Sequence, residues 1–376
     1  MGLSDNTSLC LTGGKKVAYL NVNEVESAII ALSRKYPNFT KLITLPHKSV
    51  EQRTSHALHL SSHFQSKRNT IFITGGVHAR EWGSCEICVF LAADLLEAYD
   101  QGTGLAYGGK NFTSTEIKSL FESIDFVIFP DVNPDGRLYS QTIEALWRRN
   151  RNPADSGGNN SCVGVDINRN FDFLWNFPHH FSPLAPVRTS TDPCSIDQTY
   201  HGSIPASEHE TQNVIWIFDN FPQIKWYVDI HSYGEKILTN WGDDENQSNQ
   251  QNMNFMNPAF DTVRGLKGDN AYKEYISNED RTVTLALANA MHQGIKAVRG
   301  RNYQVQQAFD LYPTSGTSDD YAYSRHMTDP SKGKIYGFTI EWGREFQPPW
   351  TEMQQIVSEV SAGIVQFSES ASGATP

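Results

Sequence analysis

The sequence is short of positive charge, of basic clusters and of long apolar runs. Its 376 residues hold 31 Lys and Arg against 42 Asp and Glu, a formal net charge of -11, without a block of consecutive basic residues. A phosphate backbone would on balance be repelled, so nucleic acid is not expected as a partner. No apolar run approaches the roughly 20 residues that cross a bilayer, so no membrane partner is expected. The first ten residues, MGLSDNTSLC, lack the charged-then-apolar order of a secretory signal, so the chain is either cytosolic or has lost a leader.

Cysteine is also scarce, and five in the whole chain are too few for a disulfide scaffold. Cys85 and Cys88 lie in an amphipathic helical pattern without a second C-x-x-C to complete a zinc site, and we interpret them as buried small hydrophobic residues. Cys162 and Cys194 flank a segment rich in Asn, Pro and Ser that a disulfide would restrain, although the sequence alone does not show that they pair. Cys10 is left over.

The apolar pattern predicts an α/β fold. With 39% hydrophobic residues the chain can bury a large core, as one large domain or as two smaller ones. Several strand-like runs, such as NTIFITGG and IDFVIFPDV, are continuously apolar, which is typical of strands buried on both faces. We therefore expect a central twisted sheet, mixed parallel and antiparallel, with helices on both faces. The helical patterns cover 83–99, 208–219, 281–298 and 350–366.

Three further segments have distinct compositions. The segment 21–38, NVNEVESAIIALSRKYPN, predicts a helix with Asn23 as its N-cap and Pro37 closing it. Residues 243–280 are polar, rich in Asn and punctuated by Gly, so we expect a long surface insertion there. The last residues, 367–376, are small and polar and predict a flexible tail.

Metal-competent side chains follow several of the predicted strands. The segment 71–81, IFITGGVHARE, runs from a strand through a Gly-Gly turn to His78 and Glu81. IKWYVDI leads to His231, and KIYGFTI leads to Glu341. Because ligand sites in open α/β sheets lie beyond the carboxyl ends of the strands, we expect these side chains to meet at one edge of the sheet.

His78, Glu81 and His231 together have the composition of a zinc site. A His-x-x-acid pair is weak evidence by itself, since His326 and Asp329 form another. His78 and Glu81 read equally well as an ion pair at the start of a helix. The second strand that ends in histidine, and the third that ends in a carboxylate, favour the metal site. Two His and one Glu leave a fourth zinc position open for water, which is a catalytic arrangement.

Six motifs resemble those of the zinc metallocarboxypeptidases of the carboxypeptidase A/B type, peptidase family M14. They are HARE, LWRR, GVDINRNFD, DIHSYG, LYPTSGTSDDY and FTIEWG, in that order along the chain. The resemblance covers nearly the whole chain and implies a single catalytic domain over 1–366. It implies one Zn²⁺ per chain, held by His78, Glu81 and His231. It also implies a disulfide between Cys162 and Cys194.

The resemblance implies that Glu341 and Arg148 are catalytic. Glu341 would take a proton from water and return it to the leaving amine. Arg148 would donate hydrogen bonds to the oxyanion, although its place in WRRNRN reads equally as a charged, solvated face. Asp166 would hold the imidazole of His78 in one tautomer.

The remaining site residues are implied to bind substrate. Asn168 and Arg169 would hold the terminal carboxylate, because a guanidinium matches a carboxylate bidentately. Tyr312 would close over the bound residue, and Arg80 would contact the substrate backbone. From the residues alone, Asn168 and Arg169 also fit a turn, and Tyr312 fits a half-buried aromatic residue.

The pocket for the C-terminal side chain is implied to carry Asp319, and a buried carboxylate favours Arg or Lys as its partner. Gly242 matches a small residue that leaves room in this pocket. Gln307 falls at a wall position where basic-preferring relatives carry something smaller, which leaves a broader preference open.

The sequence therefore predicts a zinc-dependent exopeptidase that removes C-terminal residues from peptides or proteins, with a preference for Arg or Lys or a dual basic and apolar specificity. A zinc acylase of N-acyl amino acids and an inactive binding homologue are the alternatives. The resemblance also leads us to expect a monomer that is secreted or periplasmic, with its leader removed.

Overall fold

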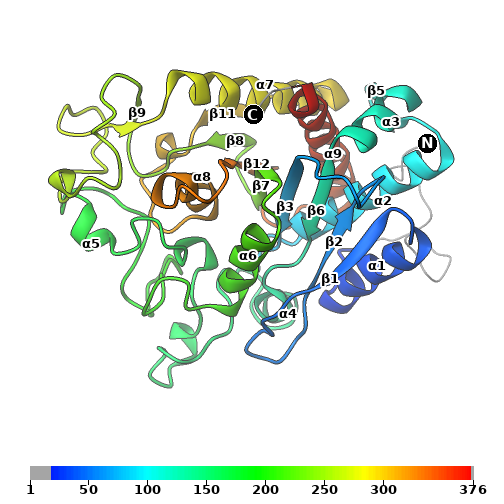
Figure 1. The fold of residues 1–376 in the computed structure, drawn as a ribbon. Helices are drawn as coiled ribbons and strands as arrows, with labels where there is room; N and C mark the ends of the chain where they lie inside the picture. The colour runs from blue at the N-terminus through cyan, green and yellow to red at the C-terminus, as the bar shows by residue number, and fades with distance from the viewer. Residues whose placement is uncertain (1–17, 374–376) are drawn as a thin grey trace.

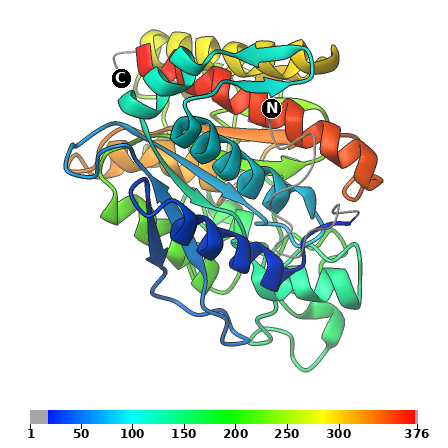
Figure 2. The same cartoon turned by 90° about the vertical axis from the view of Figure 1, so that its right-hand side faces the viewer.

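An eight-stranded mixed sheet forms the centre of the molecule (Figures 1 and 2). The computed structural model describes residues 18–373, so Cys10 lies outside the described residues. The strands lie in the order β1-β2-β6-β3-β7-β12-β8-β11. Their bounds are β1 (Thr40–Thr44), β2 (His56–Leu60), β3 (Thr70–Gly75), β6 (Asp125–Phe129), β7 (Ile224–Ser232), β8 (Lys236–Thr239), β11 (Gln304–Gln307) and β12 (Tyr336–Trp342). Two small sheets pair β4 (Leu105–Tyr107) with β5 (Lys110–Phe112), and β9 (Asn246–Gln247) with β10 (Glu274–Tyr275).

The strands of the central sheet run in both directions. β3 is parallel to β6 and β7, and β7 is parallel to β12. β12 is antiparallel to β8, and β2 is antiparallel to both β1 and β6. Since β3, β7 and β12 are parallel, their carboxyl ends reach the same edge of the sheet.

Helices cover both faces of the sheet (Figure 1). Ile71 and Ile73 of β3 face a core that includes side chains of α2, α7 and α9, whereas Phe72 faces a core that includes side chains of α6. This alternation explains why β3 is buried along its whole length. The predicted α/β class, with a mixed sheet flanked on both faces in a single domain, is confirmed. The helices are α1 (Val22–Lys35), α2 (Gly83–Gln101), α3 (Ser114–Ser123), α4 (Pro134–Thr142), α5 (Phe177–His180), α6 (His209–Asn220), α7 (Asn278–Arg299), α8 (Ser318–Thr328) and α9 (Trp350–Gly373).

The helical patterns predicted at 83–99, 208–219 and 281–298 correspond to α2, α6 and α7 within three residues at each end. In α2, Cys85 and Cys88 are fully buried free cysteines, as their interpretation as small hydrophobic residues predicts. Within residues 18–373, no helix combines the length and apolarity needed to cross a bilayer.

The first helix begins two residues earlier than predicted. Its N-cap is Asn21, so the prediction of Asn23 is wrong. Glu24 N donates to Asn21 Oδ1 at 3.0 Å, and Asn21 N donates to Glu24 Oε2 at 2.8 Å. This reciprocal pair is a capping box, and it needs an acid three residues after the cap, which Asn21 has. Pro37 follows the C-cap Tyr36, as predicted.

The last helix extends beyond its predicted end. α9 continues to Gly373, so the prediction of a flexible tail is wrong over 367–373, and 374–376 lie outside the described residues. Phe367 and Ala371 are one helical turn apart and both are buried. Their spacing lets the helix pack on the core despite its small polar neighbours, because residues four apart share a helix face.

The insertion 243–280 lies at one side of the molecule with little regular structure beyond β9 and β10 (Figure 1). It is not uniformly solvated. The insertion has a small polar core of its own, formed by four of its residues that are buried: Asp243, Arg264, Tyr272 and Glu274.

We predict that Phe367→Ala lowers the free energy of unfolding by about 3–5 kcal/mol, the usual cost of truncating a buried Phe. Phe367 is fully buried, and its ring meets that of Phe338 edge to face at 5.1 Å between centroids. Urea denaturation measures the change. Ser372→Ala, at an exposed position of the same helix, is the control and should change stability little. Equal stability of both variants would contradict the placement of this segment in the core.

Candidate active site

One cavity of about 200 Å³ gathers most of the predicted site residues. It lies at the carboxyl ends of β3, β7 and β12. Ten of the predicted residues line it: His78, Arg80, Glu81, Arg148, Asn168, Arg169, His231, Tyr312, Asp319 and Glu341. Asp166 and Gly242 are not among the lining residues, but both contact residues that are.

The turn after β3 brings His78 and Glu81 to the cavity. Gly76 has φ of 68°, a left-handed conformation that favours glycine. At Gly75 a Cβ would lie 2.7 Å from the carbonyl oxygen of Ser84, so the strand can approach α2 this closely only with glycine. The chain then reverses, and both side chains lie beyond the strand end before α2 begins.

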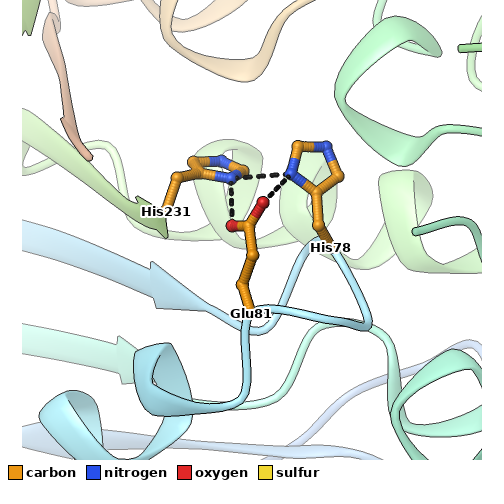
Figure 3. A group of neighbouring side chains, drawn as sticks. All are labelled: His78, Glu81 and His231. Carbon is orange, nitrogen blue, oxygen red and sulfur yellow. Dashed lines mark hydrogen bonds and ion pairs between the residues drawn. The ribbon is translucent and has the colours of Figure 1, made fainter. Parts of the chain in front are cut away.

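His78, Glu81 and His231 point toward one another (Figure 3). His78 Nδ1 lies 2.9 Å from Glu81 Oε1, and His231 Nδ1 lies 3.0 Å from Glu81 Oε2. The two Nδ1 atoms are 3.0 Å apart, and all three residues are at most 4% exposed. Ligands of a tetrahedral zinc ion are about 3.4 Å apart at normal bond lengths, so a small outward movement accommodates the ion.

Buried carboxylates hold the outer nitrogen of each imidazole. His78 Nε2 lies 3.1 Å from Asp166 Oδ1, and His231 Nε2 lies 2.8 Å from Asp229 Oδ2. Carboxylates accept hydrogen bonds, so each Nε2 carries a proton, which leaves each Nδ1 as the nitrogen that would ligate a metal ion. This arrangement is typical of histidines that ligate metal ions. The donor set therefore fits zinc.

The charges around the site depend on these pairs. Burial alone would raise the pKa of Asp166, but Arg148 and His78 outweigh it and hold the pKa well below its ordinary value. Burial would likewise raise the pKa of Asp229, and His231 with other hydrogen-bond partners lowers it. Both carboxylates are therefore ionised where they meet the imidazoles.

Asp229 is a site residue that sequence reasoning missed. It is fully buried and also accepts hydrogen bonds from Thr74 Oγ1 and Ser318 Oγ, each at 2.7 Å. A signal was present in the sequence, because Asp229 and His231 are two residues apart in one strand and so face the same side of the sheet.

Arg148 is 8% exposed, which rules out the solvated-face interpretation. Its Nε donates to Asp166 Oδ2 at 2.8 Å, and its backbone N–H donates to Gln198 Oε1 at 2.8 Å. The neighbouring Arg149 is also buried. These contacts fix the guanidinium of Arg148 at the wall of the cavity.

The disulfide Cys162–Cys194 is present in the structure. Arg149 donates to the carbonyl oxygens of Ser161 and Pro193, at 2.7 and 2.5 Å, each next to one of the two cysteines. The disulfide and Arg149 therefore hold together the two loops that surround Arg148. Sequence reasoning did not identify Arg149, because nothing in the run WRRNRN distinguishes it from the neighbouring arginines.

Asn168 and Arg169 belong to a buried turn. Asn168 Oδ1 accepts from Ser318 N at 2.8 Å, and Arg169 Nε donates to the carbonyl oxygen of Arg188 at 2.6 Å. Gly316 packs on this turn so closely that a Cβ there would lie 2.2 Å from the carbonyl oxygen of Arg169. The guanidinium of Arg169 is thus held in place at the cavity wall.

Glu341 lies beside His231 because β12 and β7 pair in parallel with these two residues in register. It is half-buried and lines the cavity. Desolvation and the nearby charge of Glu81 raise the pKa of Glu341 to about 8, and a cation held by Glu81 would lower it again toward the range of a proton acceptor.

Tyr312 and Arg80 lie at the rim of the cavity. Tyr312 is half-buried and follows a short 3₁₀ helix, Ala308–Asp310. The guanidinium of Arg188 lies 5.9 Å from its ring centroid. Arg80 stacks over the ring of Phe346 at 4.2 Å.

Asp319 lines the cavity and is 4% exposed. Its Oδ2 accepts from Thr339 Oγ1 at 2.9 Å. A Cβ at Gly242 would lie 2.5 Å from Thr314 Oγ1, so a larger residue there would push into the cavity wall.

Gln307 is not among the lining residues, and Ala308 takes that place. Gln307 therefore does not form the wall of this cavity, because its Nε2 donates to the carbonyl oxygens of Trp241 and Asp244.

The sheet and its His-Glu-His donor set indicate a metallohydrolase, and comparison with known proteins identifies the family. Residues 25–363 match the family model described as zinc carboxypeptidase. The chain therefore belongs to the zinc carboxypeptidase family, peptidase family M14, whose members are metallopeptidases.

Individual relatives agree with this assignment. Carboxypeptidase A4 of Mus musculus is 28% identical over 327 residues, which cover 86% of this chain and 62% of that protein. Carboxypeptidase B of Helicoverpa zea is 27% identical over 365 residues, which cover 96% of this chain and 72% of that protein. The solved carboxypeptidase A of Helicoverpa armigera shares the fold, with a TM-score of 0.72 and 22% identity over 99% of this chain and 76% of that one. The chain thus spans less than two thirds of the first relative.

We predict that Asp229→Asn lowers zinc affinity about 10–100-fold, the usual effect of altering the partner of a ligating histidine. The amide lacks the negative charge that supports the His231 imidazole. Competition with a chromophoric chelator measures the affinity. Asp197→Asn, which neutralises a carboxylate that is 62% exposed, should leave it unchanged. Unchanged affinity in Asp229→Asn would contradict the assigned contact.

Proposed function

We propose that this chain is an active zinc-dependent exopeptidase that hydrolyses the C-terminal peptide bond of peptides or proteins. The observation that carries the proposal is the gathering of ten expected site residues around one cavity, although they come from segments far apart in the sequence. Family membership supports the same reaction.

His78, Glu81 and His231 would hold the zinc ion. When bound, zinc supplies polarisation of a carbonyl oxygen and makes water acidic enough to lose a proton near neutral pH. Asp166 and Asp229 keep the two imidazoles in the ligating tautomer. The three ligands come from β7 and from the turn before α2, both of which are anchored in the core.

Glu341 would act as the general base and then as the general acid. Its carboxylate accepts the proton of the attacking water and returns it to the leaving amine, so no net proton is left on the protein. Arg148 would donate to the oxyanion that forms at the former carbonyl. Asp166 holds this guanidinium at 2.8 Å, so it does not have to reorganise as the charge develops.

Arg169 and Asn168 would bind the terminal carboxylate of the substrate. Recognition of that carboxylate limits cleavage to the last peptide bond, which makes the reaction exopeptidic. Tyr312 would cover the bound residue from the rim, and Arg80 would contact the substrate backbone.

The C-terminal side chain would enter the part of the cavity that contains Asp319. A buried carboxylate there favours Arg or Lys. Ala308 lines the cavity in place of Gln307, which supports a basic preference. Leu238 and Leu311 also line the cavity, so a minor activity on substrates with an apolar C-terminal residue is expected.

Two alternatives receive less support. A zinc acylase of N-acyl amino acids would bind the same terminal carboxylate through Arg169, but the relatives named carboxypeptidase A4 and carboxypeptidase B favour the peptidase. An inactive homologue would be expected to lack Glu341 or a zinc ligand, and all four residues are present.

The partners would be peptide or protein C-termini, and we expect the chain to act as a monomer. The disulfide Cys162–Cys194 favours an oxidising compartment, so we propose that the protein is secreted or periplasmic.

The test of the function is hydrolysis of hippuryl-Arg and hippuryl-Phe with and without a metal chelator. We expect activity that the chelator abolishes and zinc restores. Glu341→Gln should lower kcat about 10²–10⁴-fold while zinc stays bound, because only the proton acceptor is removed. Glu345→Gln, an exposed acid four residues further on, is the matched control. Activity that resists the chelator would overturn the proposal.

We predict that Asp319→Asn lowers kcat/KM for hippuryl-Arg about 10²–10³-fold, because a buried guanidinium without its partner costs about 3–5 kcal/mol. Hydrolysis of hippuryl-Phe should be unchanged or faster. Asp310→Asn, which neutralises a carboxylate that is 46% exposed, should leave both substrates unaffected. An equal loss on both substrates would show that Asp319 does not set specificity.

A further inference from the structure

His179 and His180 of α5 and Asp261 of the insertion form a second group of metal-competent side chains. In the part of the chain that the structure describes, only this group and the His78 group bring three such ligand atoms within 4.8 Å of one another. His180 Nδ1 lies 2.8 Å from Asp261 Oδ1, and His179 Nε2 lies 3.1 Å from Asp261 Oδ2. None of the three residues lines the active-site cavity.

The backbone holds the two segments of this group in register. Thr262 N donates to the carbonyl oxygen of His180, and Ser182 N donates to that of Arg264, each at 2.9 Å. Phe181 and Arg264 form an isolated parallel bridge between them. The carboxylate and the imidazoles therefore face each other although His180 and Asp261 are 81 residues apart in the sequence.

Arg264 orients the carboxylate of Asp261. It is fully buried, and its Nη1 donates to Asp261 Oδ1 at 2.7 Å while its Nη2 donates to the carbonyl oxygen of Asn257 at 3.0 Å. This contact leaves Oδ2 directed to the imidazole of His179. On its other side Arg264 lies near Asp243 and Glu274, and burial raises the pKa of both of these carboxyls.

We propose that His179, His180 and Asp261 bind a second divalent metal ion, which joins α5 to the insertion 243–280. Two imidazole nitrogens and one carboxylate oxygen are the donors that Zn²⁺ takes, with water completing the coordination. The side chain of His179 is 61% exposed, so its ring can rotate by the small amount that bond lengths of about 2.0–2.1 Å require. The ion is a clamp between two segments of the chain and takes no part in the reaction at the cavity.

The test counts zinc on protein that carries no affinity tag. The metal-free protein is equilibrated with zinc alone, and bound zinc is measured by mass spectrometry. We expect about two ions per chain for the wild type and about one for His179→Asn or His180→Asn. His63→Asn, at an exposed histidine outside this group, is the matched control and should keep about two.

The active site is tested separately, so that the two sites cannot be confused. The double variant His78→Asn, His231→Asn should still bind about one ion, and that ion should slow amide hydrogen exchange over 257–264. In His179→Asn, which changes a mostly exposed side chain and should fold, zinc should not slow exchange there. Equal zinc content in His179→Asn and the wild type, or an equal loss in His63→Asn, would overturn the proposal.

Discussion

The structure depends on the close approach of two imidazoles and a carboxylate in a buried setting. The Nδ1 atoms of His78 and His231 lie 3.0 Å apart, and Glu81 bridges them. Nitrogen lone pairs and a carboxylate that meet at this distance need a positive charge among them. A divalent cation would supply that charge, and the surrounding carboxylates are placed to support it. Asp166 and Asp229 each contact the outer nitrogen of one imidazole. Buried carboxylates in this position are typical of metal-ligating histidines and are costly in a purely structural core.

The scaffold explains how such a group is held. β3 and β7 are buried central strands, and their parallel pairing puts the turn with His78 and Glu81 next to the strand end with His231. β12 lies on the other side of β7 and brings Glu341 to the same edge. The rigid sheet thus sets the relative positions of the proposed ligands and the proposed general base, while longer loops carry most of the residues that we propose bind substrate. The disulfide Cys162–Cys194 restrains those loops where no regular structure does so.

Much of this arrangement could be predicted from the sequence. Continuous apolar runs that end in His or Glu predicted both the buried sheet and the meeting of His78, Glu81 and His231. Asp229 was missed because a single acid inside an apolar strand gives little signal, although its spacing from His231 was informative. α8 was not predicted, since its sequence SDDYAYSRHMT is polar and its helix depends on buried tertiary contacts.

Other errors came from side-chain direction and packing. The spacing of the motif put Gln307 on the pocket wall, but its side chain donates to the carbonyl oxygens of Trp241 and Asp244, a tertiary contact that the motif does not reveal. The last two turns of α9 are stabilised by the burial of Phe367 and Ala371 in the core. The small, polar composition of this segment does not reveal that packing. The meeting of His179, His180 and Asp261 depends on the packing of the insertion against α5, and no local pattern predicts it.

The central claim is that His78, Glu81 and His231 share one zinc ion. The most direct measurement is X-ray diffraction at the zinc absorption edge from crystals of the protein purified without added metal. We predict an anomalous peak about 2.0–2.2 Å from both Nδ1 atoms and from the Glu81 carboxylate. Two results would contradict the account. One is the absence of an anomalous peak at this position even in crystals of zinc-loaded protein, and the other is histidine rings whose Nδ1 atoms point away from each other.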